Sequence, residues 1–132
     1  MMGSSRVESR PDLQGLRLLV VEDDTLILME LEDILHDAGA EIVGPCRSVR
    51  EALPLAQANN VDAAILDFGV GSETAAPIAK CLAERGTPFL FYTGEVETGA
   101  KLGEWRQRKI LQKPAQPRAI VAAVKSLLAA SR

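Results

Sequence analysis

The sequence has few of the residues that build sulfur-rich metal sites or disulfide frameworks. It contains two cysteines, Cys46 and Cys81, which lie far apart, and one histidine, His36. This content excludes the usual structural zinc patterns and a network of disulfides. We therefore interpret both cysteines as small buried apolar residues. His36 is flanked by acidic residues on a predicted helix, and we interpret it as a solvated surface residue rather than a reactive one.

Long apolar runs and dense runs of one charge are also missing. The chain has 15 basic and 18 acidic residues and a formal charge of -3, with no basic run that would follow nucleic acid phosphates. No apolar run approaches the roughly 18 residues that cross a bilayer, and the N-terminus lacks signal-peptide features. We expect a soluble, cytoplasmic protein without direct contact to nucleic acid or membrane.

What is present fits one compact domain. The 132 residues are 47% hydrophobic, which is enough for a single sizeable core and too little chain for two ordinary domains. Residues 1–15, MMGSSRVESRPDLQG, are polar and are predicted to form a flexible tail that is native or partly of cloning origin. The remaining residues, 16–132, are predicted to form the domain and to leave no chain for an output module.

Short β-prone runs alternate with helical patterns along this domain. Strands are expected at 16–21, 41–46, 61–67, 87–93 and 109–112, and helices at 25–38, 49–59, 75–85 and 117–130. Asp24 or Thr25 is predicted to cap the first helix, and Gly39 to end it. Five β-then-α units predict a doubly wound α/β fold, in which helices cover both faces of a parallel five-stranded sheet.

The segment 95–108 is the least regular part of this pattern. Gly99 and Gly103 interrupt it, and each interior glycine costs a helix about 1 kcal/mol relative to alanine. We expect the fourth helix to be short, irregular or mobile. Trp105, in the same segment, is predicted to pack over the fourth strand, with a role as a partner anchor as the alternative.

Polar residues gather where the predicted strands end. Glu22 and Asp23 follow the first strand, Asp67 ends the third, Thr93 ends the fourth, and Lys113 follows the fifth. The carboxyl ends of parallel strands meet at one edge of the sheet, so these side chains are expected in one pocket. The plainer alternatives are a solvated acidic turn at Glu22 and Asp23 and an ordinary strand threonine at Thr93.

Such a pocket restricts the chemistry that it can carry. Carboxylates a few Å apart repel, so one keeps a proton or a cation holds them together. Oxygen ligands without histidine or cysteine suit a hard ion, and Mg2+ is the natural choice. With a hydroxyl and an ammonium nearby, a carboxylate of this kind can attack a phosphoryl group in line. The pattern predicts an aspartyl phosphate.

The same residues resemble the receiver domains of two-component response regulators. The match runs over residues 16–130 and rests on VVEDD, ILD, YTG and KP at four strand ends, in the family's order. The resemblance implies a flavodoxin-like sheet of order 2-1-3-4-5, a fold that agrees with the independent count of β-then-α units. It also implies a Mg2+-dependent transfer from a histidine kinase or a phosphotransfer protein.

The resemblance implies a role for each matching residue. Asp67 would be the phosphoacceptor, and Glu22 and Asp23 the acidic pair, with Asp23 as the direct metal ligand. The backbone carbonyl of Gly69 would complete the protein ligands of Mg2+. Thr93 and Lys113 would each bind a phosphoryl oxygen. It further implies a cis Lys113-Pro114 peptide bond, although the sequence alone favours trans.

This chain departs from the family pattern at three positions. Val70 and Gly71 stand where the family usually has Met-Pro, which predicts a more flexible loop after Asp67. Ile110 stands where the family usually has an aromatic switch residue. The fourth strand, TPFLFYTG, looks similar to that of a subgroup of stand-alone receivers which share this loss. That subgroup often works with HWE-type histidine kinases, so such a kinase is the partner that the resemblance implies.

These observations predict a single-domain response regulator that catalyses part of its own phosphotransfer and dephosphorylation and is not a conventional enzyme. It would signal through protein contacts on its fourth helix, fifth strand and fifth helix. One alternative is an interaction module that kept the fold and lost the switch, which Ile110 favours. An aspartyl phosphatase is the other, but its DxD pattern after strand one is not supplied by EDDT at 22–25.

Overall fold

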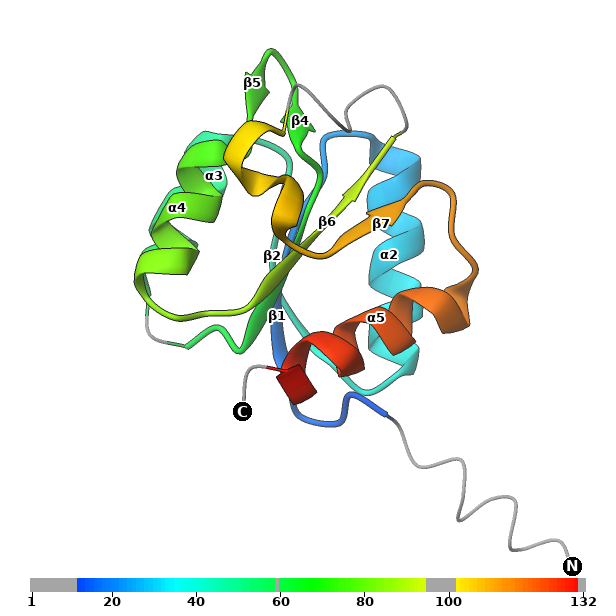
Figure 1. The fold of residues 1–132 in the computed structure, drawn as a ribbon. Helices are drawn as coiled ribbons and strands as arrows, with labels where there is room; N and C mark the ends of the chain where they lie inside the picture. The colour runs from blue at the N-terminus through cyan, green and yellow to red at the C-terminus, as the bar shows by residue number, and fades with distance from the viewer. Residues whose placement is uncertain (1–11, 59, 95–101, 131–132) are drawn as a thin grey trace, which may run out of the picture.

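The computed structural model describes residues 12–58, 60–94 and 102–130, and their centre is a parallel five-stranded sheet (Figure 1). The strand order is β2-β1-β3-β6-β7, which is the expected order 2-1-3-4-5 of a flavodoxin-like receiver fold. All four neighbouring pairs are parallel. The strands are β1 (Arg17–Val21), β2 (Glu41–Cys46), β3 (Ala63–Leu66), β6 (Phe89–Thr93) and β7 (Ile110–Gln112).

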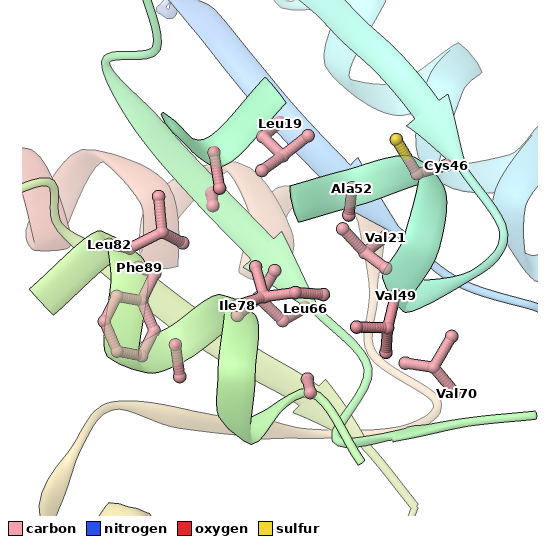
Figure 2. Packing of buried hydrophobic residues seen from close by; sticks show 14 of the residues in the cluster. Leu19, Val21, Cys46, Val49, Ala52, Leu66, Val70, Ile78, Leu82 and Phe89 are labelled. Carbon is pink, nitrogen blue, oxygen red and sulfur yellow. The ribbon is translucent and has the colours of Figure 1, made fainter. Parts of the chain in front are cut away.

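Helices cover both faces of the sheet, as the alternating pattern predicted. Helices α2 (Thr25–Asp37) and α5 (Pro117–Ala130) lie on one face, and α3 (Val49–Gln57) and α4 (Ala76–Glu84) on the other (Figure 1). Successive residues of β1 point to opposite faces, because side chains alternate along a strand. Leu18 and Val20 therefore pack with α2 and α5, while Leu19 and Val21 pack with α3 and α4. Figure 2 shows the cluster on the α3 and α4 side of the sheet, with Leu66 between these two helices.

The first helix begins where the capping pattern predicted. The Asp24 carboxylate accepts hydrogen bonds from the N–H groups of Leu26 (3.0 Å) and Ile27 (3.2 Å). These bonds satisfy backbone donors that have no partner within the first turn of a helix. Asp24 is therefore the N-cap of α2. Glu22 and Asp23, which precede it, lie at the carboxyl end of β1.

Contacts with the domain begin before the predicted boundary at residue 16. Leu13 is fully buried against α2 and α5. Its N–H donates to the Ala38 carbonyl at 2.8 Å, and that of Gly15 donates to the Gly39 carbonyl at 3.0 Å. A single leucine in a polar stretch carries no period, so its burial was not visible in the sequence. Residues 1–11 of the predicted tail lie outside the described residues.

A small hairpin that the sequence did not predict follows β3. Strands β4 (Gly69–Val70) and β5 (Glu73–Thr74) pair antiparallel, and Val70 is buried in the α3/α4 core. A more flexible loop was expected here, because the family's Met-Pro pair is absent. The structure places a paired hairpin in this loop, with Val70 as an apolar anchor and Gly71 at the left-handed φ of +65° in the turn. The expected flexibility of the loop stays a prediction.

The fourth crossover agrees with the expectation of a short, irregular helix where it is described. It contains the 3-10 helix η3 (Gly103–Gln107), and residues 95–101 lie outside the described part of the chain. Trp105 packs edge-on against Phe89 at the start of β6, with ring centroids 6.0 Å apart. The guanidinium of Arg108 lies 4.8 Å from the centre of the Phe89 ring. The predicted packing of Trp105 over the fourth strand of the sheet is confirmed.

Candidate functional site

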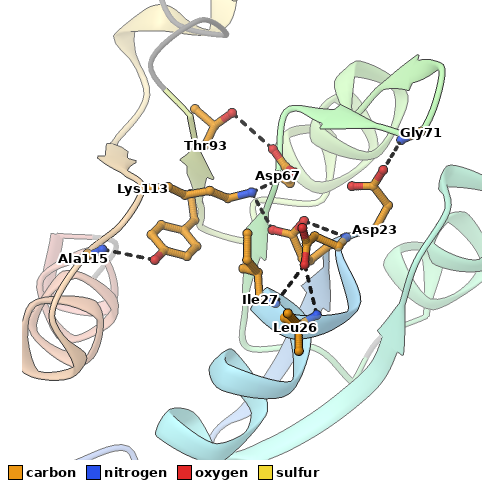
Figure 3. A network of polar contacts seen from close by, with 11 residues as sticks. Asp23, Leu26, Ile27, Asp67, Gly71, Thr93, Lys113 and Ala115 are labelled. Atoms are coloured by element: carbon orange, nitrogen blue, oxygen red, sulfur yellow. Dashed lines mark hydrogen bonds and ion pairs between the residues drawn. The ribbon is translucent and has the colours of Figure 1, made fainter.

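Carboxylates from two strand ends meet at one edge of the sheet. Glu22 and Asp23 follow β1 and Asp67 follows β3, and each offers a carboxylate oxygen within 4.8 Å of the other two. Figure 3 shows Asp67 between Thr93, at the end of β6, and Lys113, just after β7. The structure thus brings together the five side chains that the sequence predicted to share a pocket.

Asp67 is almost completely withdrawn from water, with 5% of its surface exposed. Its Oδ1 accepts a hydrogen bond of 3.2 Å from the buried Thr93 hydroxyl. Its Oδ2 accepts one of 3.0 Å from the Lys113 ammonium. Buried carboxylates need such partners because desolvation of a charge is costly. Both oxygens are therefore oriented by groups that can also bind other oxygen atoms.

Lys113 lies between two carboxylates. Its Nζ is 2.7 Å from Oε1 of Glu22 and 3.0 Å from Oδ2 of Asp67. Burial alone would lower the pKa of the Lys113 ammonium, but the close polar contacts and negative charges of Glu22 and Asp67 outweigh burial and raise this pKa above its ordinary value. Lys113 therefore stays charged throughout the neutral range.

The loop that carries Lys113 is held in place by Tyr92. The Tyr92 hydroxyl accepts a hydrogen bond of 3.2 Å from the Ala115 N–H. The centre of the Tyr92 ring lies 5.8 Å from Nζ of Lys113. The Lys113-Pro114 peptide bond is cis, as the resemblance implied. The sequence did not mark Tyr92 as part of the site, because the residue reads as an ordinary β-former.

Glu22 is the most deeply buried of the three acids, with 1% exposure. Its Oε2 accepts a hydrogen bond of 3.0 Å from the Asp24 N–H. Its Oε1 makes no directed hydrogen bond to any residue that the structure describes and has only the ionic contact with Lys113. A buried carboxylate oxygen with spare lone pairs is a suitable ligand, directly or through water, for a cation in the pocket.

Asp23 is half-buried and is held from two sides. Its Oδ2 accepts a hydrogen bond of 2.8 Å from the Gly71 N–H, and its backbone carbonyl accepts one of 3.0 Å from the Arg47 guanidinium. Sequence reasoning missed both contacts. Gly71 stood out only as a departure from the family pattern, and Arg47, which follows β2, carried no signal at all.

The donor set fits a hard divalent cation. Three carboxylates and one ammonium leave two negative formal charges uncompensated within the pocket. All ligand atoms are oxygens, which favours Mg2+ or Ca2+ over transition metals. The residues present can therefore hold Mg2+ through carboxylate oxygens at the open edge of the sheet.

Two further residues lie where the sequence placed them. His36 is exposed on α2, in agreement with its interpretation as a surface residue. Ile110, at the start of β7, is partly buried and packs against the α3/α4 core.

None of the helices among the described residues has the length and apolar content needed to cross a membrane.

Comparison with known proteins connects this geometry to one family. The response regulator receiver domain family matches residues 18–125. The transcriptional regulatory protein PdtaR of Mycobacterium tuberculosis H37Rv is 37% identical over 67 residues. That match covers 48% of this chain and 33% of PdtaR, so the chain spans only about a third of that relative's length.

The chain is also similar to solved structures of receiver proteins. SdrG from Sphingomonas melonis Fr1 is 37% identical, with a TM-score of 0.75, and the match covers 86% of this chain and 97% of SdrG. A response regulator receiver protein from Sinorhizobium medicae WSM419 has a TM-score of 0.78 at 21% identity, and the match covers 91% of this chain and 99% of that one. The second likeness bears on the fold alone.

Proposed function

The chain belongs to the response regulator receiver domain family of two-component signalling, and from this premise we propose that Asp67 accepts a phosphoryl group. One observation carries the proposal. The buried Asp67 carboxylate lies within hydrogen-bonding distance of Lys113 and Thr93, beside the acidic pair Glu22 and Asp23. These groups surround one acceptor with donors for phosphoryl oxygens on one side and ligands for a cation on the other.

The same residues support a Mg2+ site. Glu22, Asp23 and Asp67 would hold the ion through carboxylate oxygens, and when bound it would neutralise charge on the phosphoryl oxygens. The Gly69 carbonyl is the fourth proposed ligand. Ala75 donates its N–H to the Phe68 carbonyl at 2.7 Å. The next pair in the antiparallel ladder is therefore non-hydrogen-bonded, which turns the Gly69 carbonyl away from β5.

In the proposed reaction, a carboxylate oxygen of Asp67 forms a bond to phosphorus as the donor's bond to phosphorus breaks. For a phosphohistidine donor, the broken bond is P–N and the imidazole leaves. Lys113 and Thr93 already contact the two oxygens of Asp67 and would bind oxygens of the transferred group. The protein would thus catalyse part of its own phosphorylation without being a conventional enzyme.

The donor would be another protein. Receiver domains generally partner histidine kinases, and the fourth-strand sequence TPFLFYTG favours a kinase of the HWE type. A phosphotransfer protein is the alternative donor, and the transfer is proposed to take place in the cytoplasm. Two large exposed apolar side chains on α2 support a protein partner. Leu26 and Met29, on the outer side of α2, are 77% and 55% exposed. The helix that carries them begins directly after the Asp23-Asp24 loop, so a partner resting on it would face Asp67.

The signal would leave through protein contacts on the surface of η3, β7 and α5. Ile110, the first residue of β7, stands where the family usually has an aromatic switch residue. This chain therefore has no aromatic ring at that position to turn inward on phosphorylation. The alternative function is a phosphorylation-independent interaction module. It would need the fold and the exposed surface but not the donors around Asp67.

Intact mass spectrometry after incubation with Mg2+ and acetyl phosphate tests the proposal. The wild type should gain one phosphoryl group, Asp67→Asn should gain none, and the exposed control Asp37→Asn should behave like the wild type. If the wild type gains no phosphoryl group, or Asp67→Asn gains one as readily, the phosphoacceptor role of Asp67 is wrong. A wild type that stays unmodified yet binds a histidine kinase would favour the interaction module.

A further inference from the structure

The turn of the β4–β5 hairpin reaches across the sheet edge to the acidic pair. The Gly71 N–H donates a hydrogen bond of 2.8 Å to Oδ2 of Asp23, a residue 48 positions away in the sequence (Figure 3). A hydrogen bond to a carboxylate is stronger than one between neutral groups. The turn and the candidate metal ligand are therefore tied directly to each other.

Only a residue with an N–H and a left-handed backbone can make this contact without strain. Gly71 has φ +65°, a region that glycine enters freely. The receiver family usually has proline at this position. Proline carries no N–H and is restricted to φ near −65°, so it can neither donate this bond nor adopt this turn. The departure from the family pattern thus adds a donor that the common pattern lacks.

The backbone of Asp23 is held separately, by Arg47. The Arg47 guanidinium donates to the Asp23 carbonyl at 3.0 Å, and the Arg47 N–H in turn donates to Glu51 at 2.8 Å on α3. These bonds fix the backbone of the loop but leave the carboxylate free to rotate. The Gly71 N–H removes that freedom. The hydrogen bond leaves Oδ1 and a lone pair of Oδ2 for a cation, with the carboxylate in one orientation.

We infer that Gly71 is a positioning residue of the metal site, whose N–H aims the Asp23 carboxylate and links the β4–β5 hairpin to metal binding. The inference rests on the proposed function of the site. Partners that orient ligating carboxylates are often as important as the ligands, because a misaimed ligand must be reordered before the metal binds. A shift of Asp23 on metal binding would then move the hairpin, whose turn and β5 are exposed.

The hydrogen bond can be tested without metal by NMR. Asp23→Asn keeps an oxygen acceptor for Gly71, whereas Asp23→Ala removes it. The Gly71 amide should keep much of its hydrogen-exchange protection in Asp23→Asn and lose it in Asp23→Ala. The Gly86 amide, which donates to the Ala83 carbonyl at 3.1 Å, is the internal reference and should not change. Equal Gly71 protection in wild type and Asp23→Ala would overturn the inference.

The effect on the metal site is tested by calorimetric titration with Mg2+. Gly71→Pro removes the donor and should weaken Mg2+ binding by about 10- to 100-fold. Gly71→Ala keeps the N–H and its methyl group would meet no atom within 4 Å, but the φ of +65° strains an alanine. It should therefore weaken binding, by less than Gly71→Pro does. Gly86→Pro is the matched control, because it also loses an N–H at positive φ (+73°), next to α4. Its Mg2+ affinity should equal that of the wild type.

The outcomes separate this inference from the proposed function. If the wild type binds Mg2+ and is phosphorylated but Gly71→Pro binds Mg2+ as tightly, only the role of Gly71 is wrong. If the wild type binds no Mg2+, the proposed site and the inference fail together. In wild-type spectra, Mg2+ should shift the Gly71 amide resonance and leave that of Gly86 in place.

Discussion

The ammonium of Lys113 lies 2.7 Å from Oε1 of Glu22, so an ion pair joins the loop after β7 to the end of β1. These two strands are not neighbours, because β3 and β6 lie between them. The same ammonium contacts Asp67, which ends the intervening β3. Lys113 therefore compensates part of the buried negative charge before any cation or phosphoryl group arrives.

Mg2+ should stabilise the folded protein. A ligand that binds only the folded state at a concentration of 100 times its Kd adds about 2.7 kcal/mol to the free energy of unfolding. Urea unfolding with and without Mg2+ measures this gain. Asp23→Asn should reduce it strongly because an anionic ligand is lost, whereas Asp37→Asn, on the exposed end of α2, should not. An unchanged gain in Asp23→Asn would remove Asp23 from the ligand set.

Lys113→Met should destabilise the metal-free protein. It leaves the buried Glu22 and Asp67 carboxylates without their cation, and breaking a buried pair in this way costs about 3–5 kcal/mol. Saturating Mg2+ should recover part of the loss, since it also compensates the carboxylates. Chemical unfolding in both conditions checks this, and a variant as stable as the wild type without metal would contradict it.

The stabilisation by Lys113 should not depend on pH near neutrality. Its pKa is raised in the folded protein, so its contribution is complete below the unfolded pKa of about 10.4 and is lost only as pH rises through the folded value. The difference in unfolding free energy between wild type and Lys113→Met should therefore be the same at about pH 7 and about pH 9. A difference that shrinks between these values would show that Lys113 titrates earlier.

Leu26→Lys should slow phosphorylation by a protein donor and spare phosphorylation by a small one. Leu26 is 77% exposed, so its side chain adds little to folding and is available to a partner. A buried charge at an apolar contact is costly. Rates with a phosphorylated HWE-type histidine kinase and with acetyl phosphate separate the two effects. Equal rates for wild type and variant with the kinase would place its docking surface elsewhere.

Trp105→Ala should loosen the segment around η3 without affecting the pocket. Trp105 contacts Phe89 at the start of β6, whereas Thr93 ends that strand at the site. Edge-on aromatic pairs contribute about 0.5–1.5 kcal/mol beyond their buried area. Hydrogen exchange at 103–108 should rise, and the rate of modification by acetyl phosphate should stay at the wild-type value. A slower modification would connect Trp105 to the site.

Much of the fold could be predicted because hydrophobic periodicity indicates the helices and strands, and polar residues mark where the strands end. The alternation of β-prone and helical runs predicted the parallel sheet with helices on both faces, the family resemblance supplied its strand order, and Asp24 caps the predicted helix. Leu13 and the β4–β5 hairpin were missed. One leucine in a polar stretch has no period, and strands of two residues are too short to show one.

The sequence by itself determined which side chains end the strands, and parallel strands bring their carboxyl ends to one edge whatever the loops do. The meeting of Glu22, Asp23, Asp67, Thr93 and Lys113 followed from that rule. Only the tertiary structure decided how each is held. The Gly71 N–H that meets Asp23 is a backbone group which every residue except proline carries, so sequence letters cannot mark it. Its direction depends on the turn of the hairpin and on the packing of Val70 beneath it.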